Sequence, residues 1–392
     1  MMQSIPLLSP AASGNRDGDG SLQRAVEGIC RHLRSAPAVT LVVNDPQRAT
    51  RTAAVLERMR EGLANKHLRA LVATGTHHYQ AQRRRRFQAD VLSGIRFDSV
   101  AWHDCDSAEL VAVGQAPAWR CHRWLLEESR PVLAIGSCEP HYFAGITGAH
   151  KTATVGCAAA ADVQANHALA LSPDARPGRL EGNPVHEAIA AMLAGLTARN
   201  EVLAINLLQV GESILSASWG SPLEALQELA PRVRSTYICR IESAADALVL
   251  IVDGVPGRCF YQADKAIKNN EWAVRDGGCL VLRAPCPDGI GQDHFMRLLR
   301  DCPSYESADA AVRRNGYRLG DHKAIKLRYL TDRRAVRVFA VSPGLSDREL
   351  LALGFTRARN VQQALSSAGI DPAKDHVCRV ADAANTCVLV GS

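Results

Sequence analysis

The sequence contains no apolar run near the roughly 18 residues that a membrane-spanning helix needs, which argues against a transmembrane protein. Its twelve cysteines include no Cys-x-x-Cys pair and no regular spacing, so neither a zinc ribbon nor a disulfide framework is indicated. Internal repeats and long low-complexity linkers are also absent. These absences favour a reduced, cytoplasmic, globular chain.

The first twenty residues lack the basic start and the long apolar core of a signal peptide, so we expect residues 1–20 to form a disordered tail. The formal net charge of +6 suits an anionic small substrate as well as a nucleic acid. The densest basic run is Arg83 to Arg86, which is flanked by Tyr79 and Phe87. It is compatible with a nucleic-acid face, but it is more typical of a solvated helix. We expect neither a nucleic acid nor a membrane as partner.

The 392 residues are 47% hydrophobic, enough for the cores of two globular domains. Short apolar runs alternate with helical patterns, which is typical of a mostly parallel sheet with helices on both faces. We expect strands at residues 38–43, 68–73, 99–102, 131–136, 202–208, 236–241, 247–252, 279–282 and 336–341. A new strand-and-turn pattern begins near residue 242. This predicts α/β domains at residues 21–241 and 242–392, with the active site in the cleft between them.

Chemically versatile side chains are concentrated between residues 133 and 167. A buried strand is followed by His141, by the aromatic pair Tyr142–Phe143, and by a glycine-rich turn that contains the isolated Lys151. His141 lies ten residues before Lys151, and His167 lies sixteen residues after it. Because imidazole binds divalent metals and a lysine amine can be acylated, this pattern fits a metal site with a covalent cofactor. It fits equally a packed strand–loop–helix unit whose polar residues only cap and turn.

Polar residues also follow the first two predicted strands, where open α/β sheets place their ligands. Asp45 and Arg48 follow the first strand, and a guanidinium suits a carboxylate because it donates two parallel hydrogen bonds. The same pair fits a helix N-cap followed by a solvated arginine. Thr74, Gly75 and Thr76 follow the second strand, where their amides and hydroxyls can hold a phosphate or merely cap a helix.

Two further groups are candidates. His103 stands at the end of the third predicted strand, where a lone histidine is usually only a hydrogen-bonding residue. Tyr261, Gln262 and Lys265 stand at the start of a predicted helix at residues 261–273. Gln262 and Lys265 are three positions apart, so both side chains point to one side of that helix.

Together these motifs resemble those of the lactate racemase family. The resemblance rests on EPHYFAG, the following TG and Lys151, then ANH and EGNPVHE, and it extends from about Val39 to beyond Lys323. Residues 287–291 and 320–323 also fit family segments, and we interpret both as structural turns. It implies an isomerase: a racemase or epimerase of a small, lactate-like 2-hydroxy acid. It also implies the nickel-pincer nucleotide, a pyridinium mononucleotide that holds nickel through two sulfurs and a ring carbon, and enzymes that make this cofactor. The implied covalent attachment is at Lys151, and the implied nickel ligand is His167.

The resemblance assigns roles to the other candidates. His103 and His141 would be the two acid/base groups, while Arg48 and Lys265 would hold the substrate carboxylate and stabilise charge. The implied reaction moves a hydride from C2 to the cofactor and returns it to the other face of the planar 2-keto acid. The residues expected to contact the cofactor are Asp45, Thr74, Gly75, Thr76, Phe143, Tyr261 and Gln262.

Some positions depart from the family pattern. His78 and Tyr79 stand where arginine and proline are usual, His150 replaces an arginine, and the loop from Val255 to Tyr261 is short. Loss of the fixed charge at His150 and a shorter loop favour a monocarboxylate with a roomier pocket over a dicarboxylate. The alternative function is a protein that binds the cofactor or a hydroxy acid without turnover.

Overall fold

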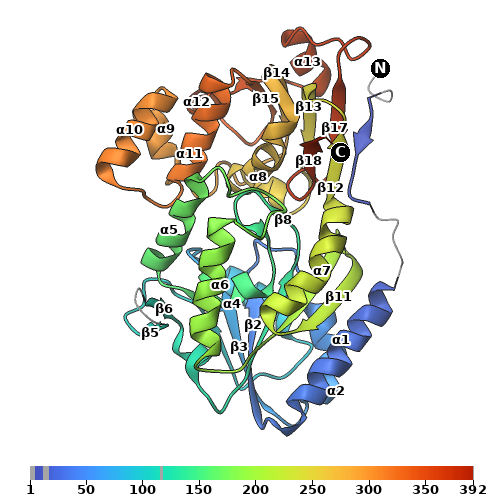
Figure 1. The fold of residues 1–392 in the computed structure, drawn as a ribbon, viewed down its shortest axis with the longest axis vertical. Helices are drawn as coiled ribbons and strands as arrows, with labels where there is room; N and C mark the ends of the chain where they lie inside the picture. Colours follow the sequence, from blue (N-terminus) through green and yellow to red (C-terminus); the bar gives the residue numbers. More distant parts are fainter. Residues whose placement is uncertain (1–4, 12–16, 115–117, 392) are drawn as a thin grey trace.

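A computed structural model describes residues 5–11, 17–114 and 118–391, which form two α/β domains, each on its own six-stranded sheet (Figure 1). The first sheet has the order β11-β10-β7-β2-β3-β4. β11 is antiparallel to β10, and the other pairings in this sheet are parallel. Its strands are Ala38–Asn44 (β2), His67–Ala73 (β3), Ser99–Trp102 (β4), Val132–Ser137 (β7), Val202–Val210 (β10) and Ser213–Gly220 (β11).

The second sheet has the order β1-β17-β13-β14-β15-β16 and is parallel throughout. The predicted fold class, two α/β domains with mostly parallel sheets, is confirmed. The strands of this sheet are Leu7–Leu8 (β1), Ala245–Ile251 (β13), Val274–Arg283 (β14), Arg337–Val341 (β15), Thr356–Arg357 (β16) and Val377–Val380 (β17).

The prediction of a disordered tail over residues 1–20 is wrong for the part that is described. Leu7–Leu8 pairs with β17, Ile5 is buried, and helix α1 already begins at Gly18. The short apolar segment supplies an edge strand to the second sheet, too brief to be recognised by periodicity. Residues 1–4 and 12–16 lie outside the described residues.

The first sheet is covered on both faces because alternate strand residues point to opposite sides. On one face, Leu41 and Val43 pack in a single cluster with α1 (Gly18–His32) and α2 (Thr52–Leu63). On the other, Val42 packs in a cluster that includes α6 (Pro184–Thr197). Each such side chain contributes about 1.5–3 kcal/mol when it is fully buried. This double burial explains the continuous apolar runs that made these strands predictable.

The second sheet is built in the same way. Leu248 and Leu250 of β13 pack with α8 (Phe260–Asn270) on one face, while Val249 packs with α13 (Val361–Ser367) on the other. The helices that complete the first of these clusters are α9 (Met296–Asp301), α10 (Tyr305–Asn315), α11 (Asp321–Arg328) and α12 (Asp347–Leu353).

The two domains meet through α8 and through a small parallel sheet. Helix α7 (Pro222–Tyr237) leads into β12 (Ile238–Ile241), which pairs with the C-terminal strand β18 (Cys387–Val390). Helix α8 contacts β8 (Pro140–His141) of the first domain. The predicted boundary near residue 242 thus falls between β12 and β13.

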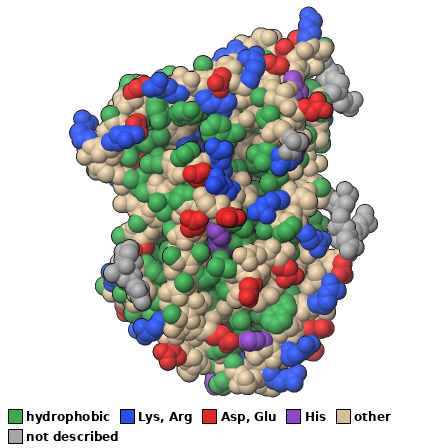
Figure 2. Space-filling view, viewed as in Figure 1, with side chains coloured by type: hydrophobic (Ala, Val, Ile, Leu, Met, Phe, Trp, Pro, Cys, Tyr) green, Lys and Arg blue, Asp and Glu red, His purple; other side chains and the backbone are tan. Residues whose placement is uncertain are grey.

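The arginine run lies on α3 (Ala81–Phe87), at the surface. The guanidiniums of Arg83 and Arg84 lie over the rings of Tyr79 and Trp102, at 5.4 Å in each case. Figure 2 shows acidic and basic side chains interspersed over one face of the molecule. Within the described ranges, no helix combines the length and apolarity that crossing a bilayer requires.

Candidate active site

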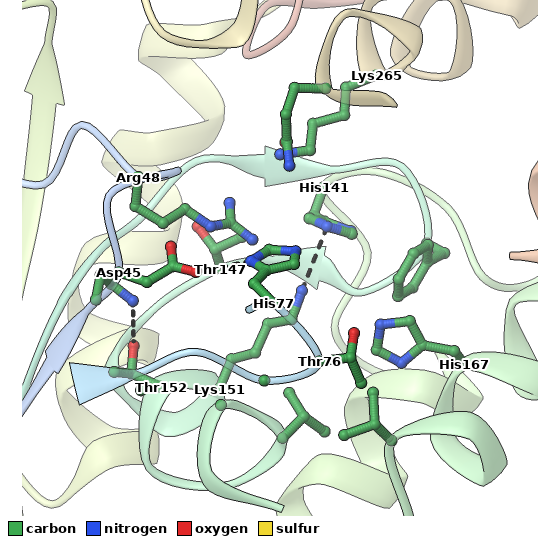
Figure 3. Close-up of a pocket in the computed structure, with 18 of the residues that line it drawn as sticks. Asp45, Arg48, Thr76, His77, His141, Thr147, Lys151, Thr152, His167 and Lys265 are labelled. Atoms are coloured by element: carbon green, nitrogen blue, oxygen red, sulfur yellow. Dashed lines mark hydrogen bonds and ion pairs between the residues drawn. The ribbon is translucent and has the colours of Figure 1, made fainter. Parts of the chain in front are cut away.

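One pocket between the two domains collects most of the predicted site residues (Figure 3). The first domain supplies the loops after β2, β3 and β7, which are neighbours in the sheet, so their carboxyl ends meet at one edge. The second domain supplies α8 and α11. The predicted residues that line the pocket are Asp45, Arg48, Thr74, Gly75, Thr76, His141, Phe143, Lys151, His167, Tyr261, Gln262 and Lys265.

Lys151 lies on a short helix, α4 (Ala149–Ala153), and not in the glycine-rich turn that we predicted. This helix starts directly against β7: a Cβ on Gly136 would stand 2.5 Å from the amide nitrogen of Ala149. Burial, followed by the charge of Arg48, lowers the pKa of Lys151 well below its ordinary value. Because a neutral amine is a nucleophile, this environment suits covalent attachment of a cofactor.

His141 is buried on β8 beside Lys151, with its Nε2 atom 3.3 Å from the lysine Nζ. Its ring meets Phe143 edge to face, with ring centroids 4.4 Å apart. Burial lowers the pKa of His141 well below its usual value, and the charge of Arg48 adds to this effect. The imidazole is therefore neutral at pH 7 and can accept a proton.

His167 lies near the end of α5 (Ala160–Ala168), and its ring centroid is 5.0 Å from that of Phe143. Burial lowers its pKa to about 3. Its Nδ1 atom is buried and has no hydrogen-bond partner among the described residues, so a neutral ring nitrogen is left unpaired. His167 thus has the features of a metal ligand.

Asp45 is buried and supports a histidine that we did not predict as catalytic. Its Oδ2 atom accepts a hydrogen bond of 2.5 Å from the Tyr79 hydroxyl and lies 2.7 Å from Nδ1 of His77. Burial alone would raise the pKa of Asp45, but His77, Tyr79 and Arg48 together lower it. Because Nδ1 of His77 faces this carboxylate, its Nε2 atom is left to exchange protons.

The prediction of His103 as an acid/base group needs correction. His103 does not line the pocket: it is buried beyond β4, with its Nε2 atom 2.9 Å from the carbonyl oxygen of Ala158. β4 is the edge strand of the sheet, one strand further from the pocket than β3. His77, which follows β3, stands in the pocket instead. The signal in the sequence was a histidine directly after Thr74–Thr76.

The pocket is rich in cations. Within the described chain, neither Arg48 nor Lys265 has a carboxylate partner within 4 Å, whereas Lys323 forms an ion pair of 3.0 Å with Asp264. Burial, followed by the charges of Arg48 and of other pocket cations, lowers the pKa of Lys265 well below its usual value. A bound anion would give Arg48 and Lys265 a partner of opposite charge and would raise the pKa of Lys265. The site is therefore electrostatically incomplete without an anionic ligand.

Sequence reasoning missed two residues from the second domain. We interpreted residues 320–323 as a structural turn, but His322 and Lys323 open α11 and line the pocket. His322 lies between two hydroxyls, with Nε2 at 2.9 Å from Tyr142 and Nδ1 at 2.7 Å from Tyr317. The match of this segment to family sequences was the available signal.

His150 does not line the pocket. It points from α4 into the core of the first domain, where it is fully buried with its ring centroid 5.4 Å from that of His186. The expectation of a monocarboxylate rested partly on His150 facing the substrate, so it loses that support.

Comparison with known proteins agrees with this geometry. The family model for the lactate racemase N-terminal domain matches residues 22–178, and the model for the lactate racemase C-terminal domain matches residues 242–388. The lactate racemase of Thermoanaerobacterium thermosaccharolyticum is 26% identical over 257 residues, which cover 63% of this chain and 58% of that protein. The lactate racemase of Lactiplantibacillus plantarum is 26% identical over 262 residues, covering 64% and 59% respectively. The matched region thus spans less than two thirds of either relative.

Solved structures share the fold. The lactate racemase apoprotein from Thermoanaerobacterium thermosaccharolyticum superposes with a TM-score of 0.82 at 20% identity, covering 98% of this chain and 94% of the other. A protein from Thermotoga maritima superposes with a TM-score of 0.73 at 14% identity, covering 96% and 99%. Both domain models match in the expected order, and the predicted resemblance is confirmed: the chain belongs to the lactate racemase family.

Proposed function

We propose that this protein is a nickel-dependent racemase that interconverts the enantiomers of lactate or of a closely related short 2-hydroxy acid. The observation that supports this most directly is the convergence of His77 and His141 on one pocket that also contains Arg48 and Lys265. A racemase has to handle protons for both enantiomers, so it needs two such groups.

Arg48 and Lys265 bind the substrate in this proposal. Arg48 comes from the first domain and Lys265 from the second, and neither has a carboxylate partner among the described residues. The planar guanidinium of Arg48 donates two hydrogen bonds to the substrate carboxylate, while Lys265 adds a second positive charge that attracts the same anion from the other domain. Bound substrate thereby bridges the domains and excludes water from the cleft.

His77 and His141 move the hydroxyl proton. His141 is neutral because burial and the charge of Arg48 lower its pKa, so its Nε2 atom accepts the proton. His77 is held by Asp45 at 2.7 Å, and the carboxylate stabilises the imidazolium that forms when Nε2 takes a proton. For one enantiomer His141 accepts the proton and His77 supplies it on the opposite side, and for the other enantiomer the roles are exchanged.

The pocket also fits the family's nickel-pincer nucleotide. Lys151 offers an amine kept neutral by burial, and His167 offers a neutral imidazole. Gly75, with φ of +54°, donates its amide to the carbonyl of Gly156 at 2.9 Å, which forms a narrow turn beside the pocket. Lys151 would hold the cofactor covalently, His167 would bind its nickel, and the turn around Gly75 would face its phosphate. When bound, the cofactor supplies a cationic ring that accepts a hydride from C2.

A direct test is racemisation by the holoprotein. The protein would be co-expressed with cofactor-making enzymes, and enantiopure L-lactate would be followed by chiral chromatography. We expect D-lactate to accumulate until the two enantiomers are equal, with His141→Ala inactive but still loaded with nickel. His167→Ala should fold normally and lose nickel. Stoichiometric cofactor without turnover of any short 2-hydroxy acid would instead indicate a binding protein.

A further inference from the structure

A second group of metal-type side chains lies outside the pocket lining, where the loops after β3 and β4 meet. It consists of His78, Cys105 and Asp106, and one donor atom from each lies within 4.8 Å of the other two. Nε2 of His78 is 3.9 Å from Oδ2 of Asp106, and the Cys105 thiol donates to the same oxygen at 3.7 Å. Nitrogen, sulfur and oxygen donors therefore surround one point.

The spacing is close to that of a tetrahedral metal site. With metal–ligand bonds of about 2.0–2.3 Å, donor atoms in such a site lie about 3.3–3.8 Å apart. The Cys105–Asp106 distance of 3.7 Å falls within this range, and the His78–Asp106 distance of 3.9 Å lies above it. His78 and Asp106 are exposed and can rotate to close the difference, while the buried Cys105 anchors the group. Their exposure leaves the fourth position open to water.

Among the described residues, no lysine or arginine balances the negative charge near the Cys105 thiol. Cys105 is buried, its thiol contacts the Asp106 carboxylate, and Asp104 precedes it directly in the chain. Among the residues that the structure describes, no lysine or arginine forms an ion pair with either aspartate. A divalent cation would neutralise this excess of negative charge and stabilise the thiolate.

We propose that His78, Cys105 and Asp106 form a second metal-binding site, which takes a divalent cation of intermediate softness, such as Zn²⁺ or Co²⁺, with water as the fourth ligand. Mixed imidazole, thiolate and carboxylate ligands favour such ions over Mg²⁺ or Ca²⁺. On binding, the Cys105 thiol releases its proton to solvent and a sulfur–metal bond forms. This site is separate from His167 and does not depend on the proposed racemase activity.

A metal bound at this site would hold together two segments that lead into the pocket. His78 directly follows His77, and the carbonyl of Cys105 accepts a hydrogen bond of 3.0 Å from the amide of Ala160 at the start of α5. The other end of α5 carries His167. Metal binding should therefore raise the unfolding temperature of the apoprotein, since it stabilises only the folded state.

Cobalt titration of the full-length apoprotein, purified without the cofactor enzymes and under reducing conditions, tests the proposal. We expect one equivalent of Co²⁺ to produce a thiolate-to-cobalt charge-transfer band in the near ultraviolet. Cys105→Ser should abolish the band, and His78→Ala or Asp106→Asn should weaken cobalt binding by at least about tenfold, because loss of an outer-shell partner alone typically costs about 10–100-fold. Cys30→Ser, a partly exposed thiol elsewhere, is the matched control and should bind normally.

His167→Ala separates this site from the nickel site of the pocket, and it should leave the charge-transfer band intact. The proposal is overturned if the band is absent at one equivalent, survives Cys105→Ser, or disappears in His167→Ala. If Cys105→Ser does not fold by circular dichroism, the double variant His78→Ala/Asp106→Asn decides. Unchanged cobalt affinity in that folded protein would also overturn the proposal.

Discussion

The two domains have similar sheets but contribute to the pocket in different ways. The first domain places Arg48, His77 and His141 on loops at the carboxyl ends of neighbouring parallel strands. The second domain places Lys265 and Lys323 on helices α8 and α11. Groups on a shared sheet edge are held rigidly against one another, whereas groups on the opposing domain depend on how the domains sit together. We infer that the first domain does the chemistry and the second mainly binds substrate.

We expect the largest effect on activity from replacing Lys151, the residue that would hold the cofactor covalently. If the first domain does the chemistry, Lys151→Ala should reduce racemisation to background, because the cofactor would lose its attachment. Intact-protein mass spectrometry should show an adduct on the wild-type holoprotein and none on the variant. Lys374→Ala, which removes an exposed lysine far from α4 in the sequence, is the matched control and should keep both adduct and activity. An adduct that remains on Lys151→Ala would reject the assignment.

The next largest effect on activity should distinguish His77 from His103 as the acid/base group. His77→Ala should lower kcat by about 10²–10⁴, the usual contribution of a positioned general acid or base. His103→Gln keeps a donor toward the carbonyl of Ala158 and should retain most of the activity. Steady-state kinetics on both variants tests this assignment. A larger loss of kcat in His103→Gln than in His77→Ala would reject His77 as the acid/base group.

These two histidines also show where sequence reasoning fails. Both follow a predicted strand, and both strands were predicted correctly from their apolar runs. The sequence does not reveal that β4 is the edge strand and β3 its inner neighbour, since strand order depends on long-range pairing. From the family resemblance we assigned the acid/base role to His103, whereas the structure places His77 in the pocket.

The same limit applies to Lys151 and His150. We interpreted residues 149–153 as a turn, and a turn gave no reason to expect that Lys151 and His150 would face different environments. On α4, consecutive side chains point about 100° apart, so Lys151 faces the pocket and His150 faces the core. A five-residue helix is too short to show a period in the sequence.

A change in the second domain should act on binding. Lys265→Met preserves chain length but removes the charge, so we expect kcat/KM to fall by about 10–150-fold, equivalent to about 1.5–3 kcal/mol, mostly through KM. Lys323→Met should behave differently, because it leaves Asp264 buried and unpaired. Urea titration should show Lys323→Met to be the less stable protein. A loss in kcat alone for Lys265→Met would mean that the second domain takes part in the chemistry.

Acid should affect the first domain more than the second. Burial lowers the pKa of six histidines in the first domain, including His122 to about 4 and His167 to about 3, but of only two described histidines in the second. Unfolded histidines take up protons near pH 6.5, so below this pH the unfolded state binds more protons and stability falls. Hydrogen exchange of the apoprotein at pH 7.5 and 5.5 should show greater loss of protection in the first sheet. Equal loss in both sheets would contradict this account.

The smallest effect on activity should come from Tyr79→Phe. The Tyr79 hydroxyl donates to the same Asp45 oxygen that faces His77, so its removal leaves the carboxylate with one fewer hydrogen bond while the histidine remains held. The ring should stay in place, because it packs against Trp102 with centroids 5.4 Å apart. We expect a stability loss of about 1.5–3 kcal/mol, as for other hydrogen bonds to charged groups, measured by urea unfolding. The loss in kcat should stay below about tenfold, which corresponds to less than about 1.4 kcal/mol of transition-state stabilisation. Asp45→Asn, which changes the His77 partner itself, should be clearly worse. If Tyr79→Phe matched Asp45→Asn in kcat, the hydroxyl and not the carboxylate would be the group that orients His77.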